Sequence, residues 1–336
     1  MYRKSSGSMV IVRVFLLAFV IVAFSPGAFR AASAPDQSTV EMGLPNDGVY
    51  GLGGQYILDK GIDRKHGFIT TPRWGGVADI ERLLAIGGVP VSLTTSESAL
   101  RANLSGIPIR LIQPFMTSHH HVLVRTESRY KSIHELRGKP LALTPEVTSL
   151  YNMFDFLMRK QGINIEKDFL LKKLGAAGII AVLEKGEVEG AILWEAHVSR
   201  LLATGRYRVI MALREELGKA LNAEVKLLGW VGALEPWVRQ NPGMVSKLRA
   251  AWEEAKGVQE DEGHFRKHAK EMFGLEKPDE VSLGWRRTRT FILPLDFRWP
   301  DVPALGAEKA YLNEGVKLGV FPKEATASVI DAMFVP

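Results

Sequence analysis

Short apolar runs alternate with helical patterns along most of this chain, and this alternation limits the possible folds more than any other feature. From Ser38 onwards, each apolar run of strand length is followed by a segment whose apolar residues recur at helical spacing. Strands that alternate with helices form sheets wrapped by helices, so we expect an α/β fold with parallel strands. The expected strands cover residues 38–44, 68–73, 90–95, 108–113, 121–125, 141–143, 168–174, 189–194, 207–211 and 225–231.

The alternation falls into two successive α/β units, which a mainly helical segment follows. No internal repeat, low-complexity tract or long linker separates the units. Two α/β lobes joined by two strand crossings form a bilobal arrangement that closes about a hinge. We expect a first lobe from residues 35–122 plus 227–336, a second lobe from residues 123–226, and a helical C-terminal return. The helices of that return are expected at 241–258, 262–273, 279–292, 304–318 and 323–333.

Residues 1–34 differ in kind from the rest of the chain. Arg3 and Lys4 precede an apolar run that is unbroken from Val14 to Phe24, and small residues follow it at 31–34. This layout is typical of a secretory signal peptide, and the run is too short for a comfortable transmembrane helix. We predict a cleavable signal peptide over residues 1–34, with cleavage after Ser33 or Ala34. An uncleaved membrane anchor is the alternative.

Charge and cysteine content exclude several classes of partner. Four of the 43 basic residues lie in residues 1–34, which contain no acid, so the rest of the chain has 39 basic against 37 acidic residues. This balance, without a basic stripe interleaved with aromatic residues, excludes a nucleic-acid partner. The chain has no cysteine, hence no disulfide, no thiolate metal ligand and no cysteine for a lipid anchor. We therefore expect a free periplasmic monomer rather than a lipoprotein.

The stretch from Lys131 to Ser149 predicts a buried strand that runs through a polar loop into a new helix. Thr148 or Ser149 is placed to cap that helix, whose apolar residues repeat at helical spacing. The amides of a first helical turn lack partners and carry partial positive charge, so such a turn can hold a small ligand. Taken alone, the stretch is equally well explained as an ordinary strand-to-helix connection with a capped helix.

Three segments of the chain carry a family resemblance. They are residues 132–143 (SIHELRGKPLAL), 183–205 (LEKGEVEGAILWEAHVSRLLATG) and 235–252 (EPWVRQNPGMVSKLRAAW). In order and spacing they resemble segments of periplasmic solute-binding proteins of the nitrate/sulfonate/taurine (NMT1/thiamine-pyrimidine-precursor-like) ABC importer family. The likeness covers most of residues 38–275. Two features depart from the family pattern: Ala196 stands where a proline is usual, and the first loop is rich in glycine at 48, 51, 53 and 54.

The resemblance implies a periplasmic-binding-protein type II fold and a role in transport. Two lobes would close on a small organic solute, anionic or aromatic, and deliver it to the permease and ATPase subunits of an inner-membrane ABC importer. The alternative is a periplasmic sensor or accessory protein that uses the same fold to contact a partner protein. Nitrate, a sulfonate, a pyrimidine and an aromatic carboxylate remain open as ligands.

An enzyme is not expected. The chain has no Gly-x-Ser-x-Gly elbow, no Walker loop and no His-Glu-x-x-His motif. Eukaryotic pyrimidine-precursor synthases of the same superfamily depend on a cysteine cluster, which a chain without cysteine lacks. No cofactor is expected.

The candidate ligand-binding residues follow from strand position, because α/β proteins bind ligands outside the carboxyl ends of their strands. Aromatic rings there either sandwich a planar ligand or pack the lobe core. Thr148 and Ser149 hold an anion or act as helix caps, and Glu195 pairs with a cationic group or favours a helix start. The candidates are Asn46, Asp47, Tyr50, Trp74, Gly75, Thr95, Ser96, His119, Thr144, Thr148, Ser149, Trp194, Glu195 and Trp230.

The run His119-His120-His121 raises the question of a metal site. Alternate residues of a strand face opposite ways, so at most His119 and His121 share a face. A closed site needs more ligands, and no nearby acid or cysteine completes one. We therefore expect no metal here and assign His119 to the cleft as a hydrogen-bonding residue.

Overall fold

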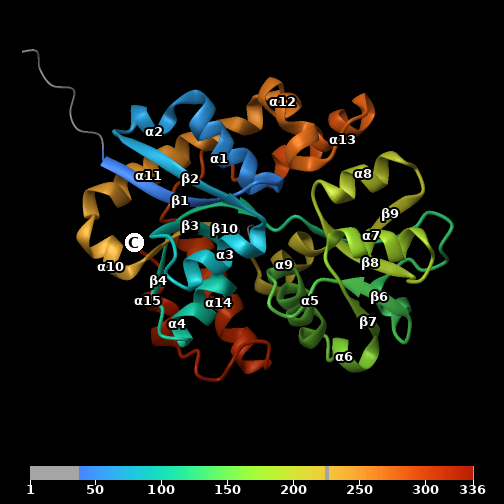
Figure 1. Ribbon diagram of the computed structural model, residues 1–336. Coiled ribbons are helices and arrows are strands. Elements are labelled where there is room, and N and C mark those ends of the chain that lie inside the picture. Colours follow the sequence, from blue (N-terminus) through green and yellow to red (C-terminus); the bar gives the residue numbers. More distant parts are fainter. Residues whose placement is uncertain (1–37, 224–226, 336) are drawn as a thin grey trace, which may run out of the picture. The chain divides into compact units, whose positions relative to one another are not determined.

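The computed structural model describes residues 38–223 and 227–335 (Figure 1). The predicted signal peptide at residues 1–34 lies outside the described residues. Among the helices of the described ranges, none combines the length and apolar character needed to cross a membrane.

The first sheet has the strand order β2-β1-β3-β10-β4. Its strands are β1 (Ser38–Pro45), β2 (Phe68–Gly75), β3 (Val91–Thr94), β4 (Ile109–Thr117) and β10 (Leu227–Leu234). Between them lie α1 (Gly48–Lys60), α2 (Ile62–Lys65), α3 (Val77–Ala85) and α4 (Ser96–Leu104). Leu44 packs against Gly54 of α1, whereas Gly43 faces Ile80 of α3, so these helices cover opposite faces of the sheet (Figure 1).

The second sheet has the order β7-β6-β8-β5-β9. Its strands are β5 (His120–Arg125), β6 (Pro140–Leu143), β7 (Leu170–Lys173), β8 (Gly190–Trp194) and β9 (Tyr207–Ala212). The helical elements are η1 (Ile133–Leu136), α5 (Ser149–Lys160), α6 (Ile165–Asp168), α7 (Ala176–Glu184), α8 (His197–Ala203) and α9 (Leu213–Leu221). The strand expected at 207–211 is present as β9, at one edge of this sheet.

The two sheets are mixed, whereas the alternation of strands and helices predicted parallel strands. β1 runs parallel to β2 and β3, but β10 is antiparallel to β3 and β4. β5 is likewise antiparallel to β8 and β9. β5 and β10 are the strands that arrive from the other lobe. They enter at the edge where the parallel strands end, and therefore run in the opposite direction. The division into lobes at residues 122 and 226 stays a prediction, and the chain passes between the sheets after Thr117 and again after Ala212.

The C-terminal return is helical, as predicted, and it touches both lobes. It comprises α10 (Glu235–Gln240), α11 (Pro242–Ala255), η2 (Lys256–Glu260), α12 (Glu262–Phe273), α13 (Pro278–Thr288), η3 (Arg289–Phe291), α14 (Val302–Lys317) and α15 (Ala327–Ala332). α11 and α12 pack on α1 of the first lobe, and α13 packs on α8 of the second lobe.

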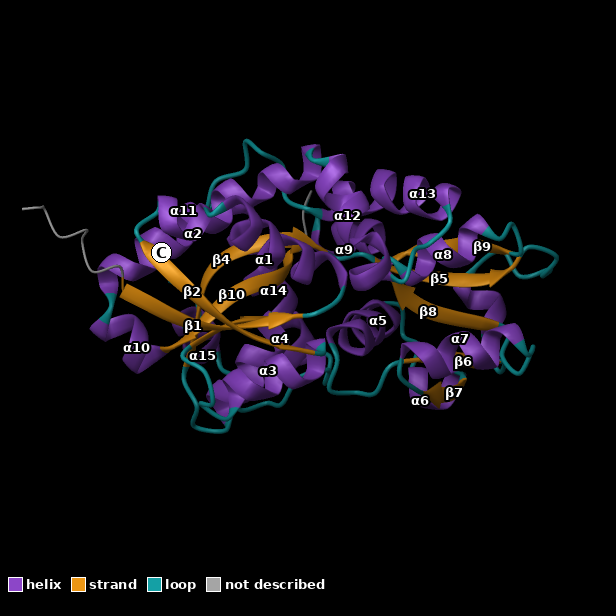
Figure 2. Ribbon diagram, turned by 45° about the horizontal axis from the view of Figure 1, so that its top comes forward, coloured by secondary structure: helices purple, strands orange, loops and turns teal. Residues whose placement is uncertain are grey.

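The apolar core is continuous between the lobes on one side. One buried cluster includes the first sheet and also Leu141 and Leu143 of β6, with the apolar residues of α5 and α9. Ala142, which points the opposite way, belongs to a second cluster with α7 and α8. α5 lies on the side of the second sheet that faces the first lobe (Figure 2). The α5 side of the second lobe is therefore buried together with the first lobe.

Candidate functional site

The carboxyl ends of the parallel strands of the first sheet carry three of the predicted groups. The backbone N–H of Asn46 donates to the Gly75 carbonyl at 2.9 Å, which joins the ends of β1 and β2. Trp74, at the same end of β2, is exposed. Tyr50 is buried, and its hydroxyl donates to the Thr94 carbonyl at 3.0 Å. Burial raises the pKa of Tyr50 well above its usual value. Asn46 and Trp74 thus remain accessible to solvent, whereas Tyr50 is buried within the first lobe.

The start of α4 places two candidate ligand-binding residues in different roles. Ser96 is the first helical residue, and Thr95 is the cap, whose hydroxyl accepts the Ser98 N–H at 3.2 Å. The reason is that Thr95 keeps extended backbone angles directly after β3, which is the geometry of a cap residue. Ser96 is consequently free to point inward, where it is fully buried.

The start of α5 resolves the alternative that the sequence left open. The hydroxyl of Thr148 accepts the Tyr151 N–H at 3.3 Å, so Thr148 is the cap. Thr144 and Thr148 share a hydrogen bond of 2.6 Å between their hydroxyls. Ser149 points into the protein, and its hydroxyl donates to Oε2 of Glu97 at 3.2 Å. The polar loop after β6 therefore reaches across to the first lobe.

Glu97 is the centre of a buried polar cluster that joins three helices. It is fully buried on α4, and it accepts hydrogen bonds from Ser149 of α5 and from the Tyr311 hydroxyl of α14 at 2.9 Å. Ser96 contacts both Glu97, at 3.3 Å, and Glu308 of α14. Burial, followed by the nearby Glu97 charge, raises the pKa of Tyr311 well above its usual value. This cluster ties the first lobe, the second lobe and the C-terminal return together.

Glu195 forms a second contact between the lobes. Its side chain is fully buried, and Oε2 accepts the N–H of Ser199 at 3.1 Å and the Ser199 hydroxyl at 2.5 Å. Oε1 accepts Nε of Arg287, from α13, at 2.6 Å. The peptide bond between Glu195 and Ala196 is cis. The cationic partner that the sequence allowed for Glu195 is thus present within the protein.

The three consecutive histidines lie at the first crossing and are all buried. Nδ1 of His121 lies 3.1 Å from the His119 carbonyl, and Arg287 donates to Nε2 of His121 at 3.1 Å. Burial and the Arg287 charge lower the pKa of His121 to about 3. Burial, together with His120 and its neighbours, lowers the pKa of His119 well below its usual value. The imidazoles of His119 and His121 are therefore neutral at pH 7.

Four buried polar atoms at the strand ends have no hydrogen-bond partner within the described part of the chain. They are Oδ1 of Asp47 after β1, Oγ1 of Thr94 at the end of β3, Nδ1 of His119 at the crossing and Nδ1 of His197 after β8. Burial raises the pKa of Asp47 and lowers the pKa of His197 to about 4. Native proteins rarely leave such groups unpaired. Both lobes therefore carry unpaired buried polar atoms at the ends of their strands.

Trp194 and Trp230, two of the candidate ligand-binding residues, lie in different surroundings. The Trp194 ring meets the His197 ring edge to face at a centroid distance of 5.1 Å, at the end of β8. Trp230 is fully buried, in edge contact with Trp299 at 4.9 Å and Phe334 at 5.5 Å. Its register partner in β3 is Thr94, and its indole Nε1 has no hydrogen-bond partner among the described residues. Trp230 thus packs the first lobe with its N–H unpaired, and its role as a ligand-binding residue stays a prediction.

A cavity of about 350 Å³ opens beside the Arg287 contact. It lies where β5 and β9 meet α13 and η3. Arg214 donates to the Thr290 carbonyl at 2.7 Å, so this guanidinium is already engaged, as is that of Arg287. The cavity is lined by His121, Ala212, Arg214, Glu215, Arg286, Arg287, Thr290 and Phe291.

The sequence missed several of these residues. His197 lies inside the second resembling segment, so its position after a strand was a usable signal. Arg287 and Glu308 lie on ordinary charged helices, and nothing local distinguishes them. Glu81 of α3 accepts the Ser98 hydroxyl at 2.7 Å, and burial raises its pKa to about 7. The raised pKa of Glu81 depends in part on the charge of Glu97, and the two residues come close only in the folded protein.

Two α/β lobes with mixed five-stranded sheets, two crossings and polar groups at facing strand ends define a periplasmic-binding-protein type II fold. Residues 69–259, more than half of the chain, match the family described as NMT1/THI5 like. The chain belongs to this family. A comparison of the sequence with curated proteins found no significant match.

Solved structures with the same fold include binding proteins for several solutes. The periplasmic aliphatic sulphonate binding protein SsuA from Escherichia coli has a TM-score of 0.71 and 17% identity, covering 89% of this chain and 92% of that one. The alkanesulfonate-binding protein SsuA from Xanthomonas axonopodis pv. citri, bound to MOPS, gives 0.70 and 16%, with 90% and 99% covered. The periplasmic nitrate-binding protein NrtA from Synechocystis PCC 6803 gives 0.67 and 13%, with 90% and 87% covered. Identities this low establish the shared fold alone.

Proposed function

We propose that this protein is the extracytoplasmic solute-binding component of an ABC importer. It captures a small organic solute between its lobes by hinge closure and delivers the solute to a permease with its ATPase. The proposal places the mature protein in the periplasm after removal of residues 1–34. Membership of the NMT1/THI5-like family and the fold shared with sulphonate- and nitrate-binding proteins support this role.

The observation that carries the proposal is the set of unpaired buried atoms at the strand ends. Asp47 and Thr94 belong to the first lobe, His119 lies at the crossing, and His197 belongs to the second lobe. Leaving a buried polar atom unpaired costs about 1–3 kcal/mol. A solute that hydrogen-bonds to atoms from both lobes removes that cost only when the lobes close on it. Binding and closure are thereby coupled.

The chemistry of these groups favours an organic solute over a bare inorganic anion. His119 and His197 are neutral at pH 7, so neither supplies a positive charge. Arg287 is already paired with Glu195. Trp194 and Trp74 offer aromatic faces beside the polar atoms. We therefore propose a planar, aromatic or heteroaromatic solute that both donates and accepts hydrogen bonds. It is bound without turnover.

A ligand screen by thermal shift tests this function. A solute at about 100 times its Kd adds about 2.7 kcal/mol to the free energy of unfolding. For a chain of this size that corresponds to a rise in melting temperature of about 5 °C. The screen should contain pyrimidines, aromatic carboxylates, alkanesulfonates and nitrate. Small-angle scattering of the same mixtures should show a smaller radius of gyration for the solute that stabilises.

Variants separate cleft binding from binding elsewhere. His197→Ala and Trp194→Ala should each weaken the stabilising solute at least tenfold, whereas His134→Ala, at an exposed position of η1, should leave it unchanged. Stabilisation by nitrate alone would overturn the proposed solute class. Failure of every compound to stabilise or compact the protein, together with native mass spectra free of any co-purified small molecule, would overturn the function.

A further inference from the structure

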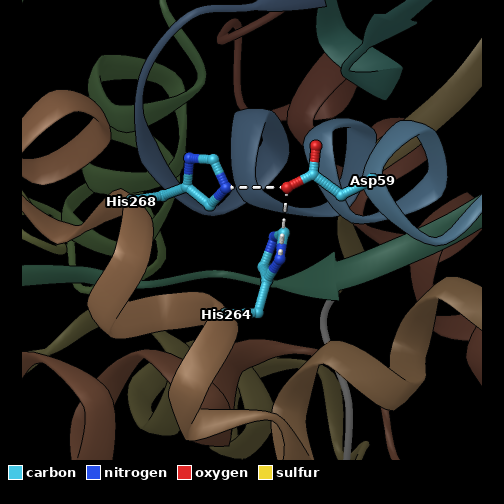
Figure 3. Close-up of side chains that lie close together, drawn as sticks. All are labelled: Asp59, His264 and His268. Carbon is cyan, nitrogen blue, oxygen red and sulfur yellow. Dashed lines mark hydrogen bonds and ion pairs between the residues drawn. The ribbon is translucent and has the colours of Figure 1, made fainter.

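Three side chains with metal-binding chemistry converge on the outer side of the first lobe. Asp59 lies in the last turn of α1, and His264 and His268 lie four residues apart on α12 (Figure 3). Residues at this spacing share one face of a helix, so both rings project toward the same point. None of the three belongs to the strand ends or lobe contacts described above.

The distances suit a single ion. Nε2 of His268 lies 3.0 Å from Oδ2 of Asp59, and Nδ1 of His264 lies 3.8 Å from the same oxygen (Figure 3). Two ligand atoms at about 2.0–2.1 Å from a tetrahedral zinc ion are about 3.4 Å apart. The observed separations bracket this value, so small side-chain rotations bring the three atoms to ligand distances.

The histidines are available as ligands. Both are buried, at 6% and 7% exposure, and Nε2 of His264 has no hydrogen-bond partner among the residues that the structure describes. Its other ring nitrogen is beyond hydrogen-bond reach of Asp59. An ion held through a ring nitrogen would give this buried imidazole a polar partner.

The surroundings orient the carboxylate. Gln55, one turn earlier on α1, donates Nε2 to Oδ1 of Asp59 at 2.7 Å. That bond fixes the carboxylate and leaves Oδ2 directed at the histidines. Lys267 competes for Oδ2, with its ammonium 2.6 Å away, but its side chain is 63% exposed and can move into solvent. An incoming cation therefore displaces an exposed ammonium, not a buried one.

We propose that Asp59, His264 and His268 bind one divalent transition-metal ion of the zinc type, with water in the remaining position. Two imidazoles and one carboxylate are the donors that zinc prefers, and they suit calcium and magnesium poorly. The ion would join α1 to α12. α1 starts directly after Asp47, and α12 leads into α13, which carries Arg287. The metal therefore braces the helices that present both the strand-end site and the lobe contact.

Isothermal titration with zinc chloride tests the site on full-length protein that EDTA treatment has freed of metal. We expect one zinc ion per chain and no binding of magnesium or calcium. Zinc should bind at least tenfold more weakly to His268→Ala and to Asp59→Asn. It should bind more tightly to Lys267→Ala, because that change removes the competing ammonium. A purely structural network of ion pairs would not produce this gain.

Controls keep the test decisive. His66→Ala removes a histidine that pairs with Glu254 on the same lobe, at 2.9 Å, and should leave zinc binding unchanged. Circular dichroism must show that every variant is folded. Zinc binding by neither the wild type nor Lys267→Ala would overturn the proposal. So would zinc binding that persists undiminished in both His268→Ala and Asp59→Asn.

Discussion

The ion pair between Arg287 and Glu195 predicts how strongly the two lobes are coupled. Nε of Arg287 lies 2.6 Å from Oε1 of Glu195; the carboxylate is fully buried and the guanidinium side chain is 26% exposed. At an effective dielectric constant of about 20, unit charges this close attract by about 6 kcal/mol. Desolvation of the buried carboxylate offsets much of that attraction. We therefore expect a net coupling free energy of about 2 kcal/mol between the two side chains.

A double-mutant cycle measures this coupling. The variants are Glu195→Gln, Arg287→Met and the double substitution, each unfolded in urea to obtain the free energy of unfolding. Arg287→Met should be the most costly single change, at about 3 kcal/mol, because it leaves a buried carboxylate without its cation. The double variant should lose about 2 kcal/mol less than the sum of the single losses.

The neighbouring residue supplies the control. Arg286 is exposed on the same helix and, among the described residues, donates to the Ser282 hydroxyl at 3.0 Å. Arg286→Met should therefore change stability by less than about 0.5 kcal/mol. Single losses that add to within about 0.5 kcal/mol would refute the reasoning, because they would show that the two side chains stabilise the fold independently.

Three further outcomes can be checked by the same unfolding measurements. Tyr311→Phe removes a donor from buried Glu97 and should lower the free energy of unfolding by about 1–3 kcal/mol. Tyr130→Phe should cost less, because the contact that the Tyr130 hydroxyl receives from Arg129 is 3.5 Å long. Equal losses would contradict this expectation. Gly229→Ala places a Cβ 1.9 Å from the Tyr50 hydroxyl and should cost about 1–3 kcal/mol or more, but Gly306→Ala, in open space within α14, should stabilise by about 0.5–1 kcal/mol. Burial, and then Arg200, lowers the pKa of His197 to about 4. The unfolded chain therefore takes up the proton first, and stability should fall as the pH drops from about 6.5 towards 4, by up to about 1.4 kcal/mol per pH unit for this residue. His197→Gln should flatten that dependence, and an unchanged slope would show that other groups dominate.

Much of the fold follows from local patterns in the sequence. The strands up to Ala212 lie close to their predicted positions, because each apolar run is bounded by glycine, proline or a capping residue. Gly61, for example, adopts the left-handed conformation that ends α1. α9 was not predicted, since it starts at Leu213 directly after β9 ends at Ala212. No turn residue marks that junction.

The candidate site was only partly predictable. Strand position identified the ends of β1, β2, β3 and β8, and hence Asp47, Trp74 and Trp194. It could not distinguish an accessible side chain from a buried one, so it gave Trp74 and Trp230 the same role. The contacts of Glu97 with Tyr311 and of Glu195 with Arg287 join residues 214 and 92 positions apart. Such pairs depend on how the helical return folds back, and no local pattern records that.

The continuous core has a consequence for how the protein can be divided and recombined. Phe156 of α5 meets Tyr311 of α14 at a ring distance of 4.9 Å, and Arg159 donates to the Leu318 carbonyl at 3.0 Å. α14 falls within the predicted first lobe, yet it packs against α5 of the second sheet. The lobes are therefore not exchangeable modules. A chimera that takes the second lobe from a related protein needs the matching face of α14 from the same parent. If α14 comes from the other parent instead, the apolar face of α5 lacks its matching partner.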